Sequence, residues 1–335
     1  IVLHRARQFS ETEQCWMGWE RKRGKLEQLV EAMTGKPKSA FVDLGPDSQL
    51  APATPYIVTL DSDTQLPPGR LRALVSVAAH PANQPRLDPT RRFVQQGYGI
   101  LQPRVVTPLP ARSEFTLFHW LFAGQCGIDP YSAPTSEVYQ DLFGEGTFTG
   151  KGLLHVAALH TVLSGRLPSG QILSHDLLEG AIARCAAVSD LTVIEDAPFH
   201  ADVAAARVHR WTRGDWQLLP ILMQPRRYGL GAIHCWKMFD NLRRSLVAPA
   251  SMVLLVVTLA GGVAVAPAAA LLLVFAALGA GPLMGAAAGF LPSRFDIAMR
   301  HFYLQATVGM GRAMAGSLWL FAQLLAQSLR ALDAV

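Results

Sequence analysis

The sequence has 335 residues, enough for about two domains. Half of the residues are hydrophobic and only 16% are charged, against about 25% in an average soluble protein. The four cysteines form no C-x-x-C pair, which excludes a zinc knuckle and a disulfide framework and leaves reduced thiols as the default.

The formal net charge is +5, and much of the excess is local. Two basic clusters, around Arg226-Arg227 and Arg243-Arg244, flank an apolar region and need only anionic lipid as a partner. A third cluster, Arg21-Lys22-Arg23, lies far from that region and requires another anion. No nucleic-acid-binding motif accompanies it, so nucleic acid is not expected as the partner.

The first two-thirds of the chain is expected to alternate strands and helices. Apolar residues at helical spacing predict a helix over residues 16–33. The β-rich run at residues 56–60 is typical of a strand buried on both faces of a parallel sheet. Other strands are expected at the chain start and over residues 97–106 and 190–195, and other helices over residues 71–79, 114–122, 153–163 and 177–187. This alternation indicates an α/β fold with a mainly parallel sheet flanked by helices.

The last third of the chain is apolar. Residues 245–293 contain no Asp, Glu, Lys or Arg, and as a helix they would extend about 70 Å, more than two bilayer cores of about 30 Å. We therefore predict a membrane region over residues 233–335, with an interfacial helix and two spans at about 246–265 and 269–291. A further apolar stretch at about 313–329 carries two glutamines, so both a third span and an interfacial helix remain open for it.

Basic residues lie on both sides of the two predicted spans. Arg243 and Arg244 precede them, and Arg294 and Arg300 follow. A helical hairpin returns to its starting side, so both basic flanks share one side of the membrane. The positive-inside rule makes that side the cytoplasm.

The triplet Asp61-Ser62-Asp63 directly follows the predicted strand at residues 56–60. In open α/β sheets, ligands bind beyond the carboxyl ends of the strands. Two carboxylates at such a place suit a hard divalent cation, which prefers oxygen ligands and bridges phosphates. An ordinary acidic turn or helix cap is the alternative, and the triplet alone does not exclude it.

A glycine-rich turn follows at residues 144–152 and resembles a phosphate-binding loop. It departs from that pattern, because Glu145 replaces the first glycine and Gly152 replaces the Ser or Thr that would hold Mg²⁺. Two interpretations remain for the turn: a backbone that approaches a ligand closely, or a plain turn.

The triplet Ser174-His175-Asp176 precedes a predicted helix. Ser174 or Asp176 could cap that helix, and the alternative is that Asp176 serves as a general base. A hydrolase triad is not expected, because adjacent residues do not form the required relay and no G-x-S-x-G elbow is present.

Residues 207–217 contain three arginines and two tryptophans. Arginine binds phosphate oxygens with two parallel hydrogen bonds, and tryptophan offers a flat face to sugars or bases. An amphipathic segment at the membrane surface is the alternative. The acidic pair Glu195-Asp196 is interpreted as a solvated strand end.

Several of these motifs occur in a fixed order. They read Trp16-Met-Gly-Trp-Glu-Arg-Lys-Arg-Gly-Lys25, Asp61-Ser-Asp-Thr64, Gly97-Tyr-Gly-Ile-Leu-Gln-Pro-Arg104, Gly144-Glu-Gly146, Ser174-His-Asp176 and His209-Arg-Trp-Thr-Arg-Gly-Asp-Trp-Gln217. In this order they resemble the glycosyltransferase domain of bacterial cyclic β-1,2-glucan synthases over most of the chain. By that likeness, residues 1–232 form a GT-A-like domain, truncated at its N-terminus and lacking its first strand and helix.

The resemblance implies an inverting enzyme of the bacterial inner membrane, with a cytoplasmic catalytic domain, that transfers glucose from UDP-glucose to a growing β-1,2-glucan. It implies that Asp61 and Asp63 hold Mg²⁺ or Mn²⁺ on the diphosphate and that Asp176 is the catalytic base. It implies substrate-binding roles for Arg21, Lys22, Lys25, Gly144, Glu145, Arg210, Trp211, Arg213, Asp215 and Trp216. The implied partners are UDP-glucose, a glucan acceptor, the lipid bilayer and further domains of the same polypeptide.

One departure limits the likeness to the cellulose and chitin synthases. Arg207 replaces the Gln of their Q-x-x-R-W signature, so their acceptor geometry is not carried over. Two alternatives stay open: another processive β-glycan synthase with its own secretion channel, and a non-catalytic membrane module.

Overall fold

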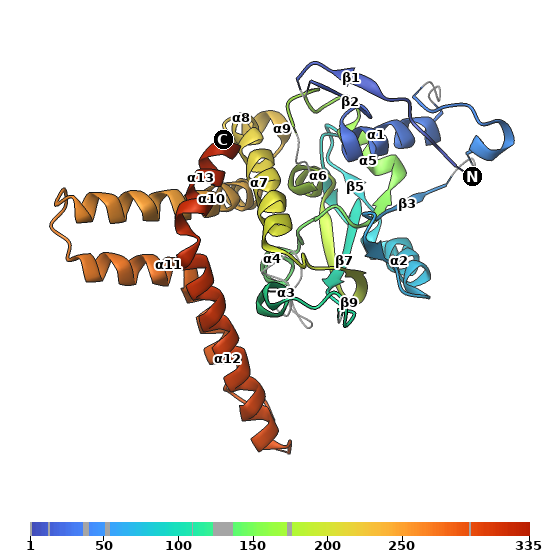
Figure 1. Cartoon of the computed structure of the whole chain (residues 1–335). Coiled ribbons are helices and arrows are strands. Elements are labelled where there is room, and N and C mark those ends of the chain that lie inside the picture. The colour runs from blue at the N-terminus through green and yellow to red at the C-terminus, as the bar shows by residue number, and fades with distance from the viewer. Residues whose placement is uncertain are drawn as a thin grey trace. The chain divides into compact units, whose positions relative to one another are not determined.

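A computed structural model describes residues 2–12, 14–35, 40–50, 54–108, 110–122, 137–172, 176–294 and 296–335 (Figure 1). The chain divides into two compact units. The sheet unit comprises Ile1–Leu109, Cys126–Asp196 and Gln217–Met238, and the helical unit comprises Pro110–Gln125, Ala197–Trp216 and Phe239–Val335. Helix α10 (Ala232–Leu259) begins at the predicted domain boundary after residue 232, and that boundary stays a prediction.

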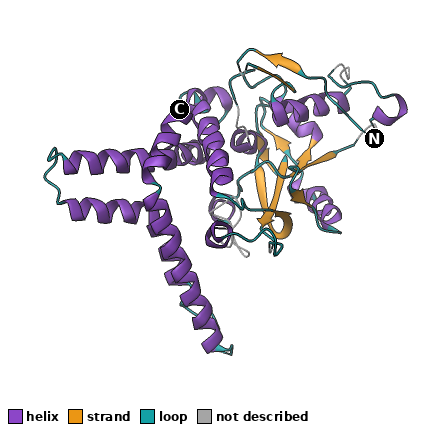
Figure 2. Ribbon diagram, viewed as in Figure 1, coloured by secondary structure: helices purple, strands orange, loops and turns teal. Residues whose placement is uncertain are grey.

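The sheet unit is built on a five-stranded sheet with the strand order β3-β8-β7-β9-β4. Its strands are β3 (Tyr56–Thr59), β4 (Thr64–Gln65), β7 (Ile100–Val106), β8 (Gly152–His155) and β9 (Cys185–Glu195). Strands β7 and β9 pair in parallel, whereas the β3–β8, β8–β7 and β4–β9 pairs are antiparallel. The α/β prediction is confirmed, but the sheet is mixed rather than mainly parallel (Figure 2).

The difference in sheet type has a local cause. Leu153 and Leu154 were expected to begin a helix, but they belong to β8. The helix starts only at Val156, where the His155 ring accepts a hydrogen bond from the Ala158 amide and caps it. Strand β8 separates β3 from β7, so β3 is an edge strand with three half-buried residues rather than a strand buried on both faces.

The remaining elements of the sheet unit surround this sheet. The short strands are β1 (Gln8–Ser10), β2 (Cys15–Met17), β5 (Arg86–Leu87) and β6 (Val94–Gln96). The helices are α1 (Arg21–Met33), η1 (Gly45–Ser48), α2 (Arg70–Ala79), η2 (Pro81–Asn83), α4 (Val138–Phe143), α5 (Val156–Leu163), α6 (Asp176–Ala183), α8 (Leu219–Leu222) and α9 (Pro225–Tyr228).

Several predicted boundaries need correction. Residues 16 and 17 are in β2 rather than in a helix, residues 185–187 belong to β9 rather than to the helix before it, and Val2 and Leu3 lie outside any strand. Helix α2 agrees with the predicted helix at residues 71–79.

Helices cover both faces of the sheet. Neighbouring residues of a strand point to opposite faces, and Ile100 and Leu101 of β7 accordingly join different core clusters. Ile100 packs in one cluster with Leu178 of α6, and Leu101 packs in the other with Leu74 of α2. All four side chains are at most 2% exposed. Burying each stabilises the fold by about 1.5–3 kcal/mol.

The helical unit contains α3 (Leu117–Phe122), most of α7 (Ala201–Gln217), the greater part of α10, α11 (Pro267–Ala288), α12 (Met299–Ala322) and α13 (Leu324–Ala334). Helices α11 and α12 approach closely: a Cβ atom on Gly279 would lie 2.9 Å from Ser317 Oγ. A small residue at this point therefore sets their separation.

Two helices are long and apolar enough to cross a membrane, namely α10 and α11. They correspond to the two predicted spans, although α10 ends at Leu259 and α11 begins at Pro267. Among the described residues no further helix has this length and hydropathy. The predicted stretch at residues 313–329 is not one helix, because it is divided between α12 and α13 at Gln323.

Candidate metal centre

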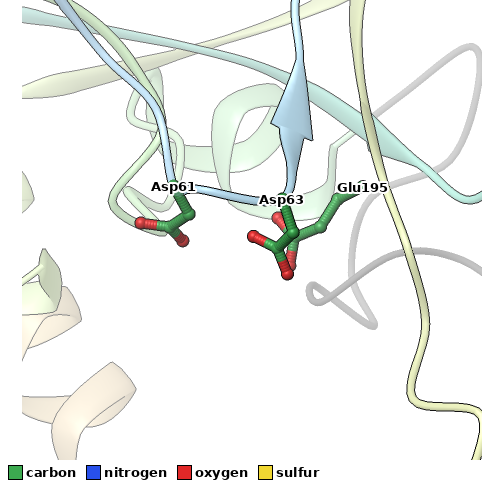
Figure 3. Close-up of side chains that lie close together, drawn as sticks. All are labelled: Asp61, Asp63 and Glu195. Atoms are coloured by element: carbon green, nitrogen blue, oxygen red, sulfur yellow. The ribbon is translucent and has the colours of Figure 1, made fainter.

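Three carboxylates meet at one edge of the sheet. Asp61, Asp63 and Glu195 each offer an oxygen atom within 4.8 Å of the others, and they form the acidic cluster (Figure 3). The first two lie in the turn from β3 to β4, and Glu195 ends β9. Thr64, paired with Glu195 in the sheet, accepts a hydrogen bond from the Asp61 amide at 3.3 Å and donates one to Glu195 Oε2 at 3.5 Å. The β4–β9 register therefore brings the acidic turn to the end of β9.

Two lysines contact this cluster. Lys151 Nζ lies 3.0 Å from Asp61 Oδ2 and 2.8 Å from Glu195 Oε2, and its side chain is 5% exposed. Lys22 Nζ lies 2.5 Å from Asp61 Oδ1 and donates to the Gly150 carbonyl at 2.6 Å. The predicted basic residue Lys22 is thus placed at the predicted metal residue Asp61.

The lysines set the charge of the cluster. Burial acts to raise the pKa of Asp61, but hydrogen bonds and charge from Lys22 and Lys151 outweigh it and hold that pKa below its ordinary value. Burial acts to lower the pKa of Lys151, but Glu195 and Asp61 raise it above its ordinary value. Asp61 is therefore ionised and Lys151 protonated at neutral pH.

Asp176 lies against the loop that carries Lys151. It is the first residue of α6, and a Cβ atom on Gly150 would lie 2.7 Å from its Oδ2 atom. Gly150 has φ +85°, a backbone conformation that favours glycine. The structure therefore places the start of α6, with Asp176, against the loop that carries Lys151, while the neighbouring Ser174 and His175 lie outside the described residues.

Sequence reasoning missed two members of this site. Glu195 was interpreted as solvated together with Asp196, which is wrong for Glu195, since it is 5% exposed, whereas Asp196 is exposed. Lys151 was considered only as part of a phosphate loop. Its position directly after Gly150, at the start of an apolar run, was a signal for a buried lysine, and a buried lysine needs carboxylate partners.

Other predicted binding residues of the sheet unit lie outside the acidic cluster. Arg21 and Lys25 are exposed at the start of α1. Gly144 ends α4 with φ +68°. Glu145 Oε1 accepts from Arg184 at 3.2 Å, and its Oε2 atom lies 2.6 Å from His234 Nε2.

The charge of Glu145 is held by these two partners. Burial acts to raise its pKa, but His234 and Arg184 keep it below its ordinary value. The described contacts thus hold Glu145 between two basic side chains of the protein. Substrate-binding roles stay predictions for Arg21, Lys25, Gly144 and Glu145.

The predicted binding residues of α7 belong to the helical unit. Three of them are exposed, namely Arg210, Trp211 and Arg213. The other two, Asp215 and Trp216, form hydrogen bonds with α10. Asp215 Oδ1 accepts from Asn241 at 3.0 Å, and Trp216 Nε1 donates to a serine of α10 at 3.0 Å. Burial, only partly offset by the Asn241 hydrogen bond, raises the pKa of Asp215 to about 6. These contacts hold α7 against α10, and sugar or phosphate binding by the five residues stays a prediction.

No protein-family model matches the chain. It is 43% identical over 301 residues, 90% of its own length, to Cyclic beta-(1,2)-glucan synthase NdvB of Rhizobium meliloti (strain 1021). It spans only 10% of the length of that protein. The resemblance inferred from the ordered motifs is therefore confirmed, and the chain is homologous to one segment of a cyclic β-(1,2)-glucan synthase.

Proposed function

We propose that this chain is the glucosyl-transfer segment of a glucan synthase in the bacterial inner membrane. In this proposal it transfers glucose from UDP-glucose to a growing β-1,2-glucan with inversion, on the cytoplasmic side. The acidic cluster at the ends of β3 and β9, with Asp176 at the start of α6 against the adjoining loop, is the observation that carries the proposal. The printed name of the relative supports glucan synthesis.

The chain spans a small part of that relative, so further domains are proposed to belong to the active polypeptide. Ring closure of the product is not assigned to this chain. The two apolar helices α10 and α11 are proposed as its membrane spans.

The acidic cluster fits a divalent cation such as Mg²⁺ or Mn²⁺. Its three carboxylates supply the oxygen donors that hard cations prefer, and they outnumber the two ammonium groups of Lys22 and Lys151 beside them. Asp61, Asp63 and Glu195 would hold the ion. When bound, it would neutralise charge on the diphosphate leaving group.

The chain's own residues supply the remaining chemistry in this proposal. The ammonium groups of Lys22 and Lys151 place fixed positive charge where a diphosphate would leave, and such preorganised charge is often worth several kcal/mol. The Asp176 carboxylate takes the proton from a glucan hydroxyl as that oxygen attacks the anomeric carbon. A general base of this kind contributes about 10²–10⁴-fold.

The test is glucose transfer by the complete synthase polypeptide in membranes, with radiolabelled UDP-glucose as the donor. Asp176→Asn should lower the rate by about 10²-fold or more, because the asparagine side chain does not accept the proton. Asp196→Asn, an exposed acidic residue next to the cluster, is the matched control and should leave the rate unchanged. A near-normal rate in Asp176→Asn would remove this residue as the base.

Linkage analysis of the product tests whether the glucan formed is β-1,2-linked. A β-1,2-linked product supports it, whereas a different β-linkage would favour another processive β-glycan synthase. Absence of any glucose transfer by the complete wild-type polypeptide would favour a non-catalytic membrane module.

A further inference from the structure

The sheet unit contains a second feature, apart from the acidic cluster, that the proposed function does not use. A pocket with a volume of about 240 Å³ lies between the β1–β2 hairpin, the start of α1 and the loop before α6. Pockets for drug-sized ligands measure roughly 300–1,000 Å³, so this pocket suits a smaller ligand such as one or two sugar rings.

The walls of this pocket are bonded to each other. Trp19 Nε1 donates to Ser169 Oγ at 3.1 Å, and Ser169 Oγ donates to Glu20 Oε1 at 3.1 Å. The amide of Gly170 donates to the same Glu20 oxygen. These hydrogen bonds join the start of α1 to the loop before α6 and fix the plane of the Trp19 indole ring. The cavity is thus a built pocket rather than a gap between two loose loops.

The lining of the pocket has the chemistry that recognises a sugar. Phe9 and Trp19 contribute aromatic rings, which suit the C–H groups of a pyranose ring, and Gln8 and Gln171 contribute amides, which suit its hydroxyl groups. Phe9 is 49% exposed, so part of its ring is accessible to a ligand.

The lining of the pocket offers no excess positive charge for a nucleotide diphosphate. Arg21 is the one basic residue among the described residues that line the pocket, and Glu11 of the same lining balances its charge. The other acidic residue, Glu20, is paired with Arg23 at 2.7 Å. A lining without excess positive charge does not attract a diphosphate, whereas its hydrogen-bonding groups suit an uncharged glycan.

The pocket adjoins the acidic cluster through the chain itself. Arg21 lines the pocket, and the next residue, Lys22, contacts Asp61 at 2.5 Å. Lys22 also donates to the Gly150 carbonyl at 2.6 Å, and Gly150 lies against Asp176. A ligand in the pocket would therefore lie beside the segments that carry the proposed base and one cluster lysine.

We infer that this pocket binds a segment of the glucan acceptor. The inference rests on the proposed function and adds a binding site to it. The acceptor chain places one sugar against Phe9 and Trp19, and its growing end is thereby held toward Asp176.

A site-resolved binding experiment tests this inference. The probe is sophorose, the β-1,2-linked glucose disaccharide, carrying a photoreactive diazirine group, and the target is the complete synthase polypeptide. Labelled peptides are identified by mass spectrometry over a range of probe concentrations. We expect saturable labelling of the peptides that contain residues 8–21 or 169–172.

Two variants in the pocket should weaken this labelling. Phe9→Ala and Gln171→Ala alter side chains that line the pocket but carry none of the hydrogen bonds between its walls. Each should raise the half-saturating probe concentration about fivefold, equivalent to about 1 kcal/mol. Phe115→Ala removes a ring that is 56% exposed outside the pocket and should change nothing. Absence of labelling at these peptides, or equal labelling in the pocket variants, would overturn the inference.

Steady-state kinetics separate this inference from the proposed function. The pocket variants should raise the KM for an oligosaccharide acceptor and leave the KM for UDP-glucose unchanged. A raised KM for UDP-glucose with an unchanged acceptor KM would assign the pocket to the donor and contradict the inference. If the wild-type polypeptide transfers no glucose, the proposed function fails, and the photolabelling still decides whether the pocket binds the disaccharide.

Discussion

Lys151 Nζ lies 2.8 Å from Glu195 Oε2, and both side chains are 5% exposed. Lys151 directly precedes β8 and Glu195 ends β9, and these strands are not neighbours in the sheet, since β7 lies between them. The same ammonium group also contacts Asp61 at 3.0 Å. One buried lysine therefore links the start of β8, the end of β9 and the acidic turn after β3.

The first prediction concerns the stability of this ion pair. Lys151→Met removes the ammonium group that faces the buried Glu195 carboxylate and should destabilise the sheet unit by about 3–5 kcal/mol. Lys151→Met combined with Glu195→Gln should recover most of that loss, because the buried charge that faced Lys151 is removed as well. Amide hydrogen exchange of the β8 and β9 peptides in the complete polypeptide measures the destabilisation in the single variant and its recovery in the double variant.

Lys22→Met is the matched control for this experiment. The side chains of Lys22 and Asp61 are 27% and 37% exposed, so breaking their pair should cost less than about 1 kcal/mol. If the double variant exchanges as fast as Lys151→Met alone, the charge of Glu195 is not the cause of the instability.

The second prediction concerns the contact of Gly150 with Asp176. Gly150→Ala places a methyl group 2.7 Å from Asp176 Oδ2, so the carboxylate must move and the rate of glucose transfer should fall at least about tenfold. Gly69→Ala is the control, because Gly69 has a similar φ of +80° but no atom within 4 Å of an added Cβ. Equal rates for the two variants would show that only backbone strain matters.

The third prediction concerns metal binding by the acidic cluster. Asp63→Asn and Glu195→Gln each remove a charged oxygen donor and should raise the dissociation constant for Mn²⁺ at least about tenfold. Electron paramagnetic resonance of free Mn²⁺ in titrations of the purified polypeptide measures this constant. Asp196→Asn should bind Mn²⁺ as the wild type does, and equal weakening in all three variants would point to a general charge effect instead.

The fourth prediction is a pH dependence that originates at Asp215. Its pKa is raised from 3.8 to about 6 by burial, so its neutral form is favoured in the folded protein. The resulting stabilisation is present below pH 3.8 and is lost as the pH rises through about 6. The loss is on the order of 3 kcal/mol.

Asp215→Asn should remove this dependence. As the pH rises from 4.5 to 7, the free energy of unfolding of the wild type should fall relative to that of the variant. Hydrogen exchange of the α7 peptides, corrected for intrinsic rates, measures this difference. A constant difference between the two proteins over this range would contradict the raised pKa.

Local pattern determined several parts of this protein. The β-rich run before Asp61 predicted β3, the apolar residues after Gly69 predicted α2, and the uncharged stretch at residues 245–293 predicted two long apolar helices. Each of these signals lies within one element, where the spacing of apolar side chains reports the local conformation. The ordered motifs also carried the resemblance to the glucan synthases, which the relative confirms.

Only the tertiary structure decided how the site is assembled. Leu153 and Leu154 fit a helix and a strand equally well, and the pairing of β8 with β3 and β7 selects the strand. Glu195 becomes a member of the acidic cluster because the β4–β9 register places it beside the acidic turn. Lys151 is kept charged by carboxylates from two distant segments. Strand order and register fix these contacts, and they depend on long-range pairing that the periodicity of a single segment does not encode.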